Sequence, residues 1–145
     1  MSTTSRTVSA TPGQVWSVLA DGWLYPLFVV GASRIRDVDD TWPAVGSRLH
    51  HSVGAWPLLI DDTTEVLEVE EDQRIVLQAR GWPAGEARVE ISLSPATDGT
   101  VVTIVENATS GPGALVPKPV QDVQLHLRNT ETLRRLAFVA EGRKR

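Results

Sequence analysis

Histidine is the side chain best suited to acid–base chemistry near neutral pH, and this chain has three histidines. His50 and His51 are neighbours in the stretch RLHHSV, whereas His126 lies close to the C-terminal end. An imidazole can serve as a general base, so His51 and His126 are the candidate catalytic residues. Together with Asp122 they would also supply the two histidines and one carboxylate of a metal-binding triad.

The residues around His50 and His51 decide which of these roles is available. Alternating apolar and polar residues predict a strand over 46–53, in which neighbouring side chains point to opposite faces. His51 then shares the apolar face with Leu49 and Val53, and His50 points to water. A one-residue slip in register would exchange the two histidines. Their spacing matches no metal motif, so an inward, hydrogen-bonded His51 is the preferred interpretation, and no metal or cofactor is predicted.

The predicted C-terminal helix carries the second part of the candidate site. Helical spacing over residues 120–141 places one stripe of residues inward, namely Asp122, His126, Asn129, Leu133, Leu136, Ala137 and Ala140. The end of this stripe is apolar or small, as a core contact requires. Its beginning is polar, and a buried polar group without a partner costs about 1–3 kcal/mol. We therefore expect Asp122, His126 and Asn129 to face a cavity; the alternative is that this end of the helix projects into water.

The remaining elements follow from capping and periodicity. Thr11, Pro12 and Gln14 have the spacing of a capping box with proline at the first helical position. Period-two patterns and turn residues predict the strands. The predicted order is a strand over 4–9, a helix from Pro12, a small helix within 23–30, strands over 33–39, 46–53, 58–70, 74–80, 86–94 and 100–108, and a long helix over 120–141.

This order predicts an α+β fold in a single domain that spans residues 1–145. A curved antiparallel sheet needs one face covered, and the last helix is the only predicted element long enough to cover it. We therefore expect the sheet to wrap around the long C-terminal helix, with two short helices between strands 1 and 2.

Composition excludes several classes of protein. The net charge of −4 disfavours a nucleic-acid binder, which would carry an excess of basic residues. The absence of cysteine excludes disulfides and thiolate metal sites. No run approaches the roughly 18 apolar residues of a membrane span, so no membrane insertion is predicted. The stretch MSTTSRTVSA lacks the apolar core of a signal peptide, which favours a cytoplasmic location.

Further apolar residues are expected to line the cavity. Val89 and Ile91 lie on the apolar face of the strand over 86–94 and would form its floor, and Leu133 on the C-terminal helix is also expected to line it. Trp56 and Trp82 stand beside prolines in turns, where each would either cap the core or border the mouth of a pocket. The faces of three carboxylates stay open, because alternation there fits both sides of the sheet: Asp61, Asp62 and Glu106.

Several stretches together resemble a known superfamily. They are ATPGQVW at 10–16, VGSR at 45–48, TEVLEV at 64–69 before RIVL at 74–77, GTVVTIVE at 99–106, SGPG at 110–113, RNTETLRRLA at 128–137 and the ending EG at 141–142. On these stretches the chain is similar to the START-like, or birch-pollen-allergen-like, helix-grip superfamily (SRPBCC). More narrowly, it resembles the bacterial polyketide cyclase/dehydrase and lipid transport group, over nearly the whole chain.

The resemblance implies a cavity between the sheet and the C-terminal helix that holds hydrophobic or aromatic ligands. It also implies that Trp23 and Phe28, on the small second helix, border the opening of this cavity, although the same residues could simply close the core. It provides no catalytic motif that could be mapped onto this chain residue by residue.

Three functions remain open at this point. The first is binding of a hydrophobic or aromatic small molecule, with His51, His126 and Asn129 as polar contacts. The second is a polyketide aromatase/cyclase- or dehydratase-type enzyme that uses His51 or His126 as general base. The third is a regulatory or protein-interaction module whose cavity is vestigial. An exposed edge strand and the turn tryptophans would suit a homodimer, which nothing in the sequence requires.

Overall fold

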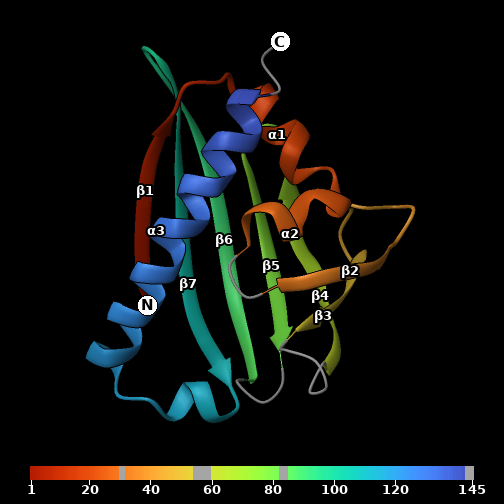
Figure 1. Cartoon of the computed structure of the whole chain (residues 1–145), viewed down its shortest axis with the longest axis vertical. Coiled ribbons are helices and arrows are strands. Elements are labelled where there is room, and N and C mark those ends of the chain that lie inside the picture. The colour runs from red at the N-terminus through yellow and green to blue at the C-terminus, as the bar shows by residue number, and fades with distance from the viewer. Residues whose placement is uncertain (30–31, 54–59, 82–84, 143–145) are drawn as a thin grey trace.

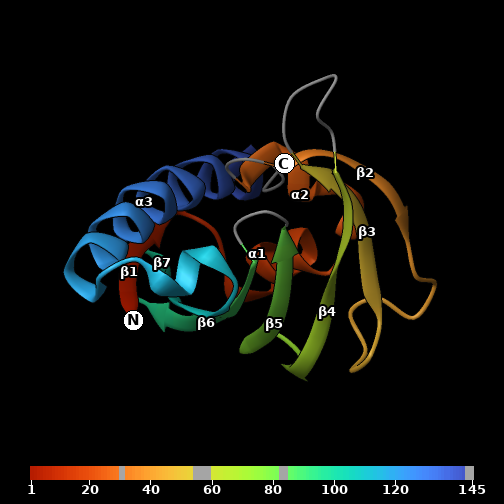
Figure 2. The same cartoon turned by 90° about the horizontal axis from the view of Figure 1, so that it is seen from below.

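The computed structural model describes residues 1–29, 32–53, 60–81 and 85–142. It has a curved, seven-stranded antiparallel sheet with a long helix along its concave side (Figures 1 and 2). The elements are β1 (Ser2–Val8), α1 (Pro12–Leu19), η1 (Gly22–Leu24), α2 (Tyr25–Phe28), β2 (Ala32–Val38), β3 (Arg48–Val53), β4 (Ile60–Glu70), β5 (Arg74–Gly81), β6 (Gly85–Ala96), β7 (Gly99–Ser110), η2 (Pro112–Leu115) and α3 (Lys118–Gly142). The predicted α+β helix-grip fold is confirmed, including the short helices between the first two strands.

The strands follow each other through the sheet in the order β1-β7-β6-β5-β4-β3-β2. Strands β2 to β7 therefore form a meander, and β1 pairs with β7, with Ser2 opposite Glu106 and Val8 opposite Thr100. Because directly paired residues share a face, these registers fix which side chains point to the concave side. The concave side faces α3, and β1 lies next to this helix (Figure 1).

Helix α1 begins as its sequence predicts. The Thr11 hydroxyl accepts from the backbone N–H of Gln14 at 3.2 Å, and the Gln14 side chain accepts from the backbone N–H of Thr11 at 2.8 Å. This reciprocal pair satisfies two donors that would otherwise lack partners at the start of the helix. The helix then buries Val15, Trp16, Val18 and Leu19.

Glycine is required where β6 starts beside the end of β7. Gly85 has a φ of +102°, and a Cβ there would lie 2.1 Å from the backbone oxygen of Ser110. Another residue would therefore strain the backbone and clash with the neighbouring strand. This close approach brings the ends of β6 and β7 together near the start of α3.

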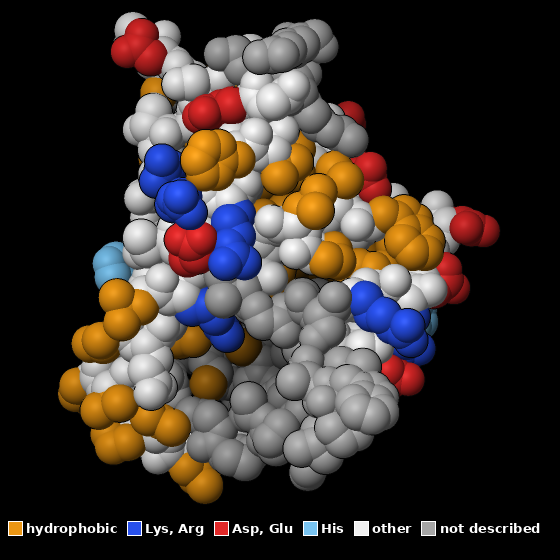
Figure 3. All heavy atoms as spheres, viewed as in Figure 1, with side chains coloured by type: hydrophobic (Ala, Val, Ile, Leu, Met, Phe, Trp, Pro, Cys, Tyr) orange, Lys and Arg blue, Asp and Glu red, His pale blue; other side chains and the backbone are white. Residues whose placement is uncertain are grey.

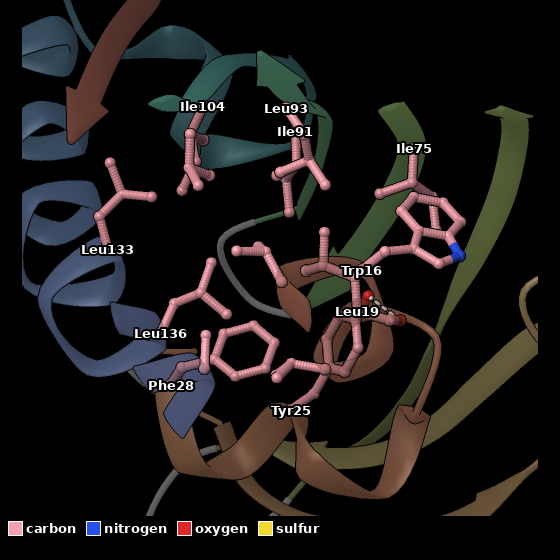
Figure 4. Close-up of a cluster of buried hydrophobic side chains, with 14 of the residues drawn as sticks. Trp16, Leu19, Tyr25, Phe28, Ile75, Ile91, Leu93, Ile104, Leu133 and Leu136 are labelled. Atoms are coloured by element: carbon pink, nitrogen blue, oxygen red, sulfur yellow. Dashed lines mark hydrogen bonds between the residues drawn. The ribbon is translucent and has the colours of Figure 1, made fainter. Parts of the chain in front are cut away.

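One end of the concave side is filled by a hydrophobic core (Figure 4). Phe28 and Tyr25 of α2 contact each other with ring centroids 4.8 Å apart, and Phe28 lies beside Leu136 of α3. The hydroxyl of Tyr25 donates to the backbone oxygen of Leu19 at 2.9 Å, so the buried phenol has a partner. The sheet contributes Ile75, Ile91, Leu93, Val102 and Ile104, all buried.

The second half of α3 matches the predicted inward stripe. Leu133 and Leu136 are 1% and 0% exposed, and Ala137 and Ala140 are buried with them. Burying one leucine side chain contributes about 1.5–3 kcal/mol, so this stretch anchors the helix on the core.

The first half of α3 does not match the prediction. Asp122 is partly exposed and accepts from the N-terminal ammonium of Met1 at 2.9 Å, and His126 is exposed, with its Nδ1 3.0 Å from the Thr4 hydroxyl. The prediction that both side chains turn inward is therefore wrong, whereas Asn129 is buried as predicted. The prediction assumed one inward direction along the whole helix. Here α3 runs beside the edge strand β1, so its buried face rotates toward Gln121 and Asn129.

Among the described residues, no helix has the length and apolar content to cross a membrane.

Candidate functional site

At the other end of the concave side, the described residues do not form a closed core. On the paired strands β6 and β7, the inward residues near the core are buried, but Val89, Ala87 and Ala108 are only half-buried. Ala79 on β5, opposite Ala87, is half-buried too. Small side chains at this end of β5, β6 and β7 leave space on the concave side of the sheet. We call this space the hollow, and its floor consists of Ala79, Ala87, Val89 and Ala108. The molecule is visibly hollowed beside the first half of α3 (Figure 3).

A pocket of about 380 Å³ lies at the same end of the sheet and is lined by Asp62, Arg80, Gly85, Glu86 and Ser110. Arg80 donates to Glu86 at 2.7 Å, and Ser110 donates to the same carboxylate at 3.0 Å. These two hydrogen bonds hold the pKa of Glu86 below its usual range, and the bond from Arg80 has the larger effect. Two of the lining residues, Gly85 and Ser110, lie two positions from floor residues along their strands, so this pocket adjoins the hollow at its rim.

Glu106 lies between the hollow and the closed core. It is 5% exposed and occupies the inward position of β7 between buried Ile104 and half-buried Ala108. Arg128 of α3 forms an ion pair with its Oε2, and Asn129 donates to its Oε1 at 3.2 Å. A buried carboxylate requires such partners. The open question about its face is thereby settled: Glu106 points inward.

His51 takes the inward position on β3 that the sequence predicts. Its side chain is 8% exposed, and its Nε2 lies 2.9 Å from the hydroxyl of Thr64 on β4. Burial lowers the pKa of His51 below its usual range, and the negative charge of Asp62 partly opposes this effect. Its backbone partner across the ladder is Asp62, so both point to the concave side.

The neighbours of His51 and Asp62 point the other way. The Nε2 of His50 lies 2.8 Å from the Asp39 carboxylate. This hydrogen bond is the main reason why the pKa of Asp39 is lowered. Asp61 accepts from Ser52 at 2.7 Å and its side chain is 62% exposed. The sequence prediction that the two histidines do not form a pair is confirmed.

The structure distributes the other predicted site residues among three places. Val89 belongs to the floor of the hollow, whereas Ile91, Phe28 and Leu133 lie in the closed core. Trp23 is 55% exposed and lines a separate pocket of about 270 Å³ with Asp21, Asp39, Trp42 and others. Trp56 and Trp82 lie outside the described residues.

No metal centre is formed by the described part of the chain, in which no three His, Asp or Glu side chains cluster suitably. The triad considered from the sequence is not assembled, because His51 lies on β3 and His126 contacts β1 near the opposite edge of the sheet.

Sequence reasoning missed the cluster of Glu106, Arg128 and Asn129. Alternation along β7 already placed Glu106 in phase with Val102 and Ile104, but valines and threonines on both faces left that phase undecided. Arg128 lies outside the inward stripe that helical spacing predicts. Its side chain is 42% exposed, yet its guanidinium reaches the Glu106 carboxylate. Long arginine stems commonly extend in this way, so helical position alone does not place the charge.

Comparison with solved structures shows the same fold. A protein from Nitrosomonas europaea matches with a TM-score of 0.75 and 19% identity, covering 98% of this chain and 94% of that one. Ara h 8.0201 matches with a TM-score of 0.72 and 12% identity, covering 97% and 96%. The di-domain ARO/CYC StfQ from the steffimycin biosynthetic pathway matches with a TM-score of 0.71 and 15% identity, covering 97% of this chain and 50% of that one.

In sequence, no curated protein matches the chain. A family model does match, over residues 2–141. The chain therefore belongs to the family described as polyketide cyclase / dehydrase and lipid transport.

Proposed function

We propose that this protein binds a hydrophobic or aromatic small molecule in the hollow between the sheet and the first half of α3. The observation that carries the proposal is the floor of Ala79, Ala87, Val89 and Ala108, which faces the helix but is only half-buried. Small-molecule sites are concave and mostly apolar, with a few placed polar groups. The family description, which includes lipid transport, supports the same class of ligand.

The dimensions of the site favour a molecule larger than a single ring. Glu106 on β7 and His51 on β3 stand on opposite sides of the floor, and four strand spacings separate their strands. At about 4.8 Å per spacing this amounts to about 19 Å across the strands, measured along the curved sheet. A ligand of two or more fused rings can therefore cover the apolar floor and still meet a polar group at its end.

The proposal is tested by filling the hollow. We expect Ala87→Phe to raise the dissociation constant of 2-naphthol at least about tenfold, because the new ring occupies the ligand's space. Ala96→Phe is the matched control, since Ala96 is exposed at the far end of β6. Binding is measured by titration calorimetry, and circular dichroism checks that both variants fold. Equal affinity in the wild type and Ala87→Phe would refute binding in the hollow.

A second candidate function is acid–base catalysis on the bound ligand, with His51 as the base. The observation in its favour is the inward, buried position of His51 beside Thr64, where burial lowers the pKa of the imidazole and so favours its neutral, proton-accepting form. A poly-β-keto thioester is the appropriate substrate for the test. If His51 is the base, His51→Gln lowers turnover by roughly 10²–10⁴-fold while 2-naphthol still binds. Equal turnover in both proteins, or none in the wild type, would exclude this role.

A further inference from the structure

Glu106 is a buried carboxylate at the border of the hollow. Its inward neighbours on β7 are Ile104, in the closed core, and Ala108, in the floor, and its partner across the ladder to β6 is Val89 of the floor. An apolar side chain would fit this position as part of the core surface. A carboxylate there lowers the stability of the fold unless it is paired and hydrogen-bonded, because taking a charge out of water is costly.

The partners of Glu106 determine what else it can bind. Arg128 balances its charge, and Asn129 donates one further hydrogen bond. An ionised carboxylate has about four acceptor sites, so two side-chain donors leave acceptor capacity unused. The cluster is therefore electrically balanced and still able to accept a hydrogen bond from the side of the hollow.

We propose that Glu106 is a specificity-determining residue that selects ligands by a neutral hydroxyl group, which donates to the carboxylate while the apolar body covers the floor. This inference rests on the proposed binding function. A neutral donor gains a hydrogen bond to an ionised acceptor, which is stronger than one between neutral groups. An ammonium group finds a charge already balanced by Arg128, and a carboxylate group would have to displace Glu106 from its own partners.

The experiment compares ligands of the same shape. 2-Naphthol and 2-methylnaphthalene differ in a hydroxyl against a methyl group, and 2-naphthoate adds a negative charge. We expect the wild type to bind 2-naphthol about tenfold more tightly than 2-methylnaphthalene, the size expected of one hydrogen bond to a charged group. We expect Glu106→Gln to reduce this preference severalfold, because its amide is a weaker acceptor, and to leave the affinity for 2-methylnaphthalene nearly unchanged. Glu90→Gln, a partly exposed carboxylate on the outer face of β6, is the matched control.

The outcomes separate the two proposals. If both neutral ligands bind equally well to the wild type, the role of Glu106 is refuted and the binding function stands. If 2-naphthoate binds most tightly, or if Glu106→Gln keeps the full preference, the hydroxyl is not read by Glu106. If none of the three ligands binds, both proposals fail. If Glu106→Gln does not fold, equal binding of 2-naphthol and 2-methylnaphthalene by the wild type still refutes the role of Glu106.

Discussion

Asn129 on α3 donates its side-chain amide to the Glu106 carboxylate on β7 at 3.2 Å, and Arg128 pairs with the same carboxylate. These contacts connect the helix to the sheet at the border between the closed core and the hollow. Toward the start of α3, Asp122 accepts from the N-terminal ammonium of Met1 at 2.9 Å, His126 lies 3.0 Å from the Thr4 hydroxyl, and Asn107 of β7 accepts from Lys118 at 2.8 Å. The second half of α3 packs on the apolar core, and Glu141 near its end accepts from the backbone N–H of Ser9 at 3.0 Å.

The Glu106–Arg128 pair predicts a compensating double substitution. Arg128→Met leaves a buried carboxylate without its counter-charge, and we expect the free energy of unfolding to fall by about 1–3 kcal/mol. Adding Glu106→Leu removes the unpaired charge, so the double variant is expected to recover at least half of this loss, as measured by urea denaturation. A double variant less stable than Arg128→Met alone would show that the pair is not coupled as described.

The core anchor of α3 predicts a large difference between two leucines of one helix. Leu133 is 1% exposed and Leu127 is 66% exposed. We expect Leu133→Ala to lower the free energy of unfolding by about 2–5 kcal/mol through a cavity in the core. Leu127→Ala is the matched control and is expected to change it by at most about 0.5 kcal/mol. Similar effects of both changes would contradict the described packing of α3.

His51 predicts a loss of stability in mild acid. Because its pKa in the folded protein is lowered below the unfolded value of about 6.5, the unfolded chain takes up the proton more readily as pH falls. The contribution to stability is complete above about pH 6.5 and is lost as pH falls toward the lower, folded pKa. We expect His51→Gln to reduce the slope of unfolding free energy against pH in this window.

The pKa of His51 can be followed directly through the ring resonances in an NMR titration. Thr64→Val is the control, because it removes the hydrogen-bond partner at 2.9 Å but keeps the burial that is the main cause of the shift. We expect the pKa to stay below the usual range in the wild type and in this variant. Titration of His51 at or above about 6.5 in the wild type would contradict its burial.

The position of His126 predicts that it does not contact the ligand. Its ring is exposed and lies 3.0 Å from the Thr4 hydroxyl at the edge strand. We expect His126→Leu to bind 2-naphthol with the affinity of the wild type, whereas Ala87→Phe does not. Loss of binding in His126→Leu, with folding retained, would place the ligand on the β1 side of α3 instead.

Local patterns predicted most of the fold. Strand alternation found β1 to β7 to within a few residues, and Thr11 with Gln14 identified the start of α1. These features depend on neighbours in sequence, so the sequence alone carries them. The apolar end of α3 was also correct, because Leu133 and Leu136 meet the core at regular helical spacing.

The candidate site depended on contacts between distant segments, and there prediction failed in part. Asp122 and His126 turn to Met1 and Thr4 because α3 runs beside β1, a relationship that no helical period contains. Glu106 faces inward although its strand is apolar on both sides. His51 was placed correctly because its own strand alternates clearly, with Leu49 fixing the buried face.

The most direct test of ligand binding in the hollow is an NMR measurement of nuclear Overhauser effects between bound 2-naphthol and methyl groups of the protein. The account predicts contacts with the methyl groups of the floor, namely Ala79, Ala87, Val89 and Ala108. Contacts instead with Val120, Val123 and Leu127, which are exposed on α3, or no contacts at saturating ligand, would contradict it.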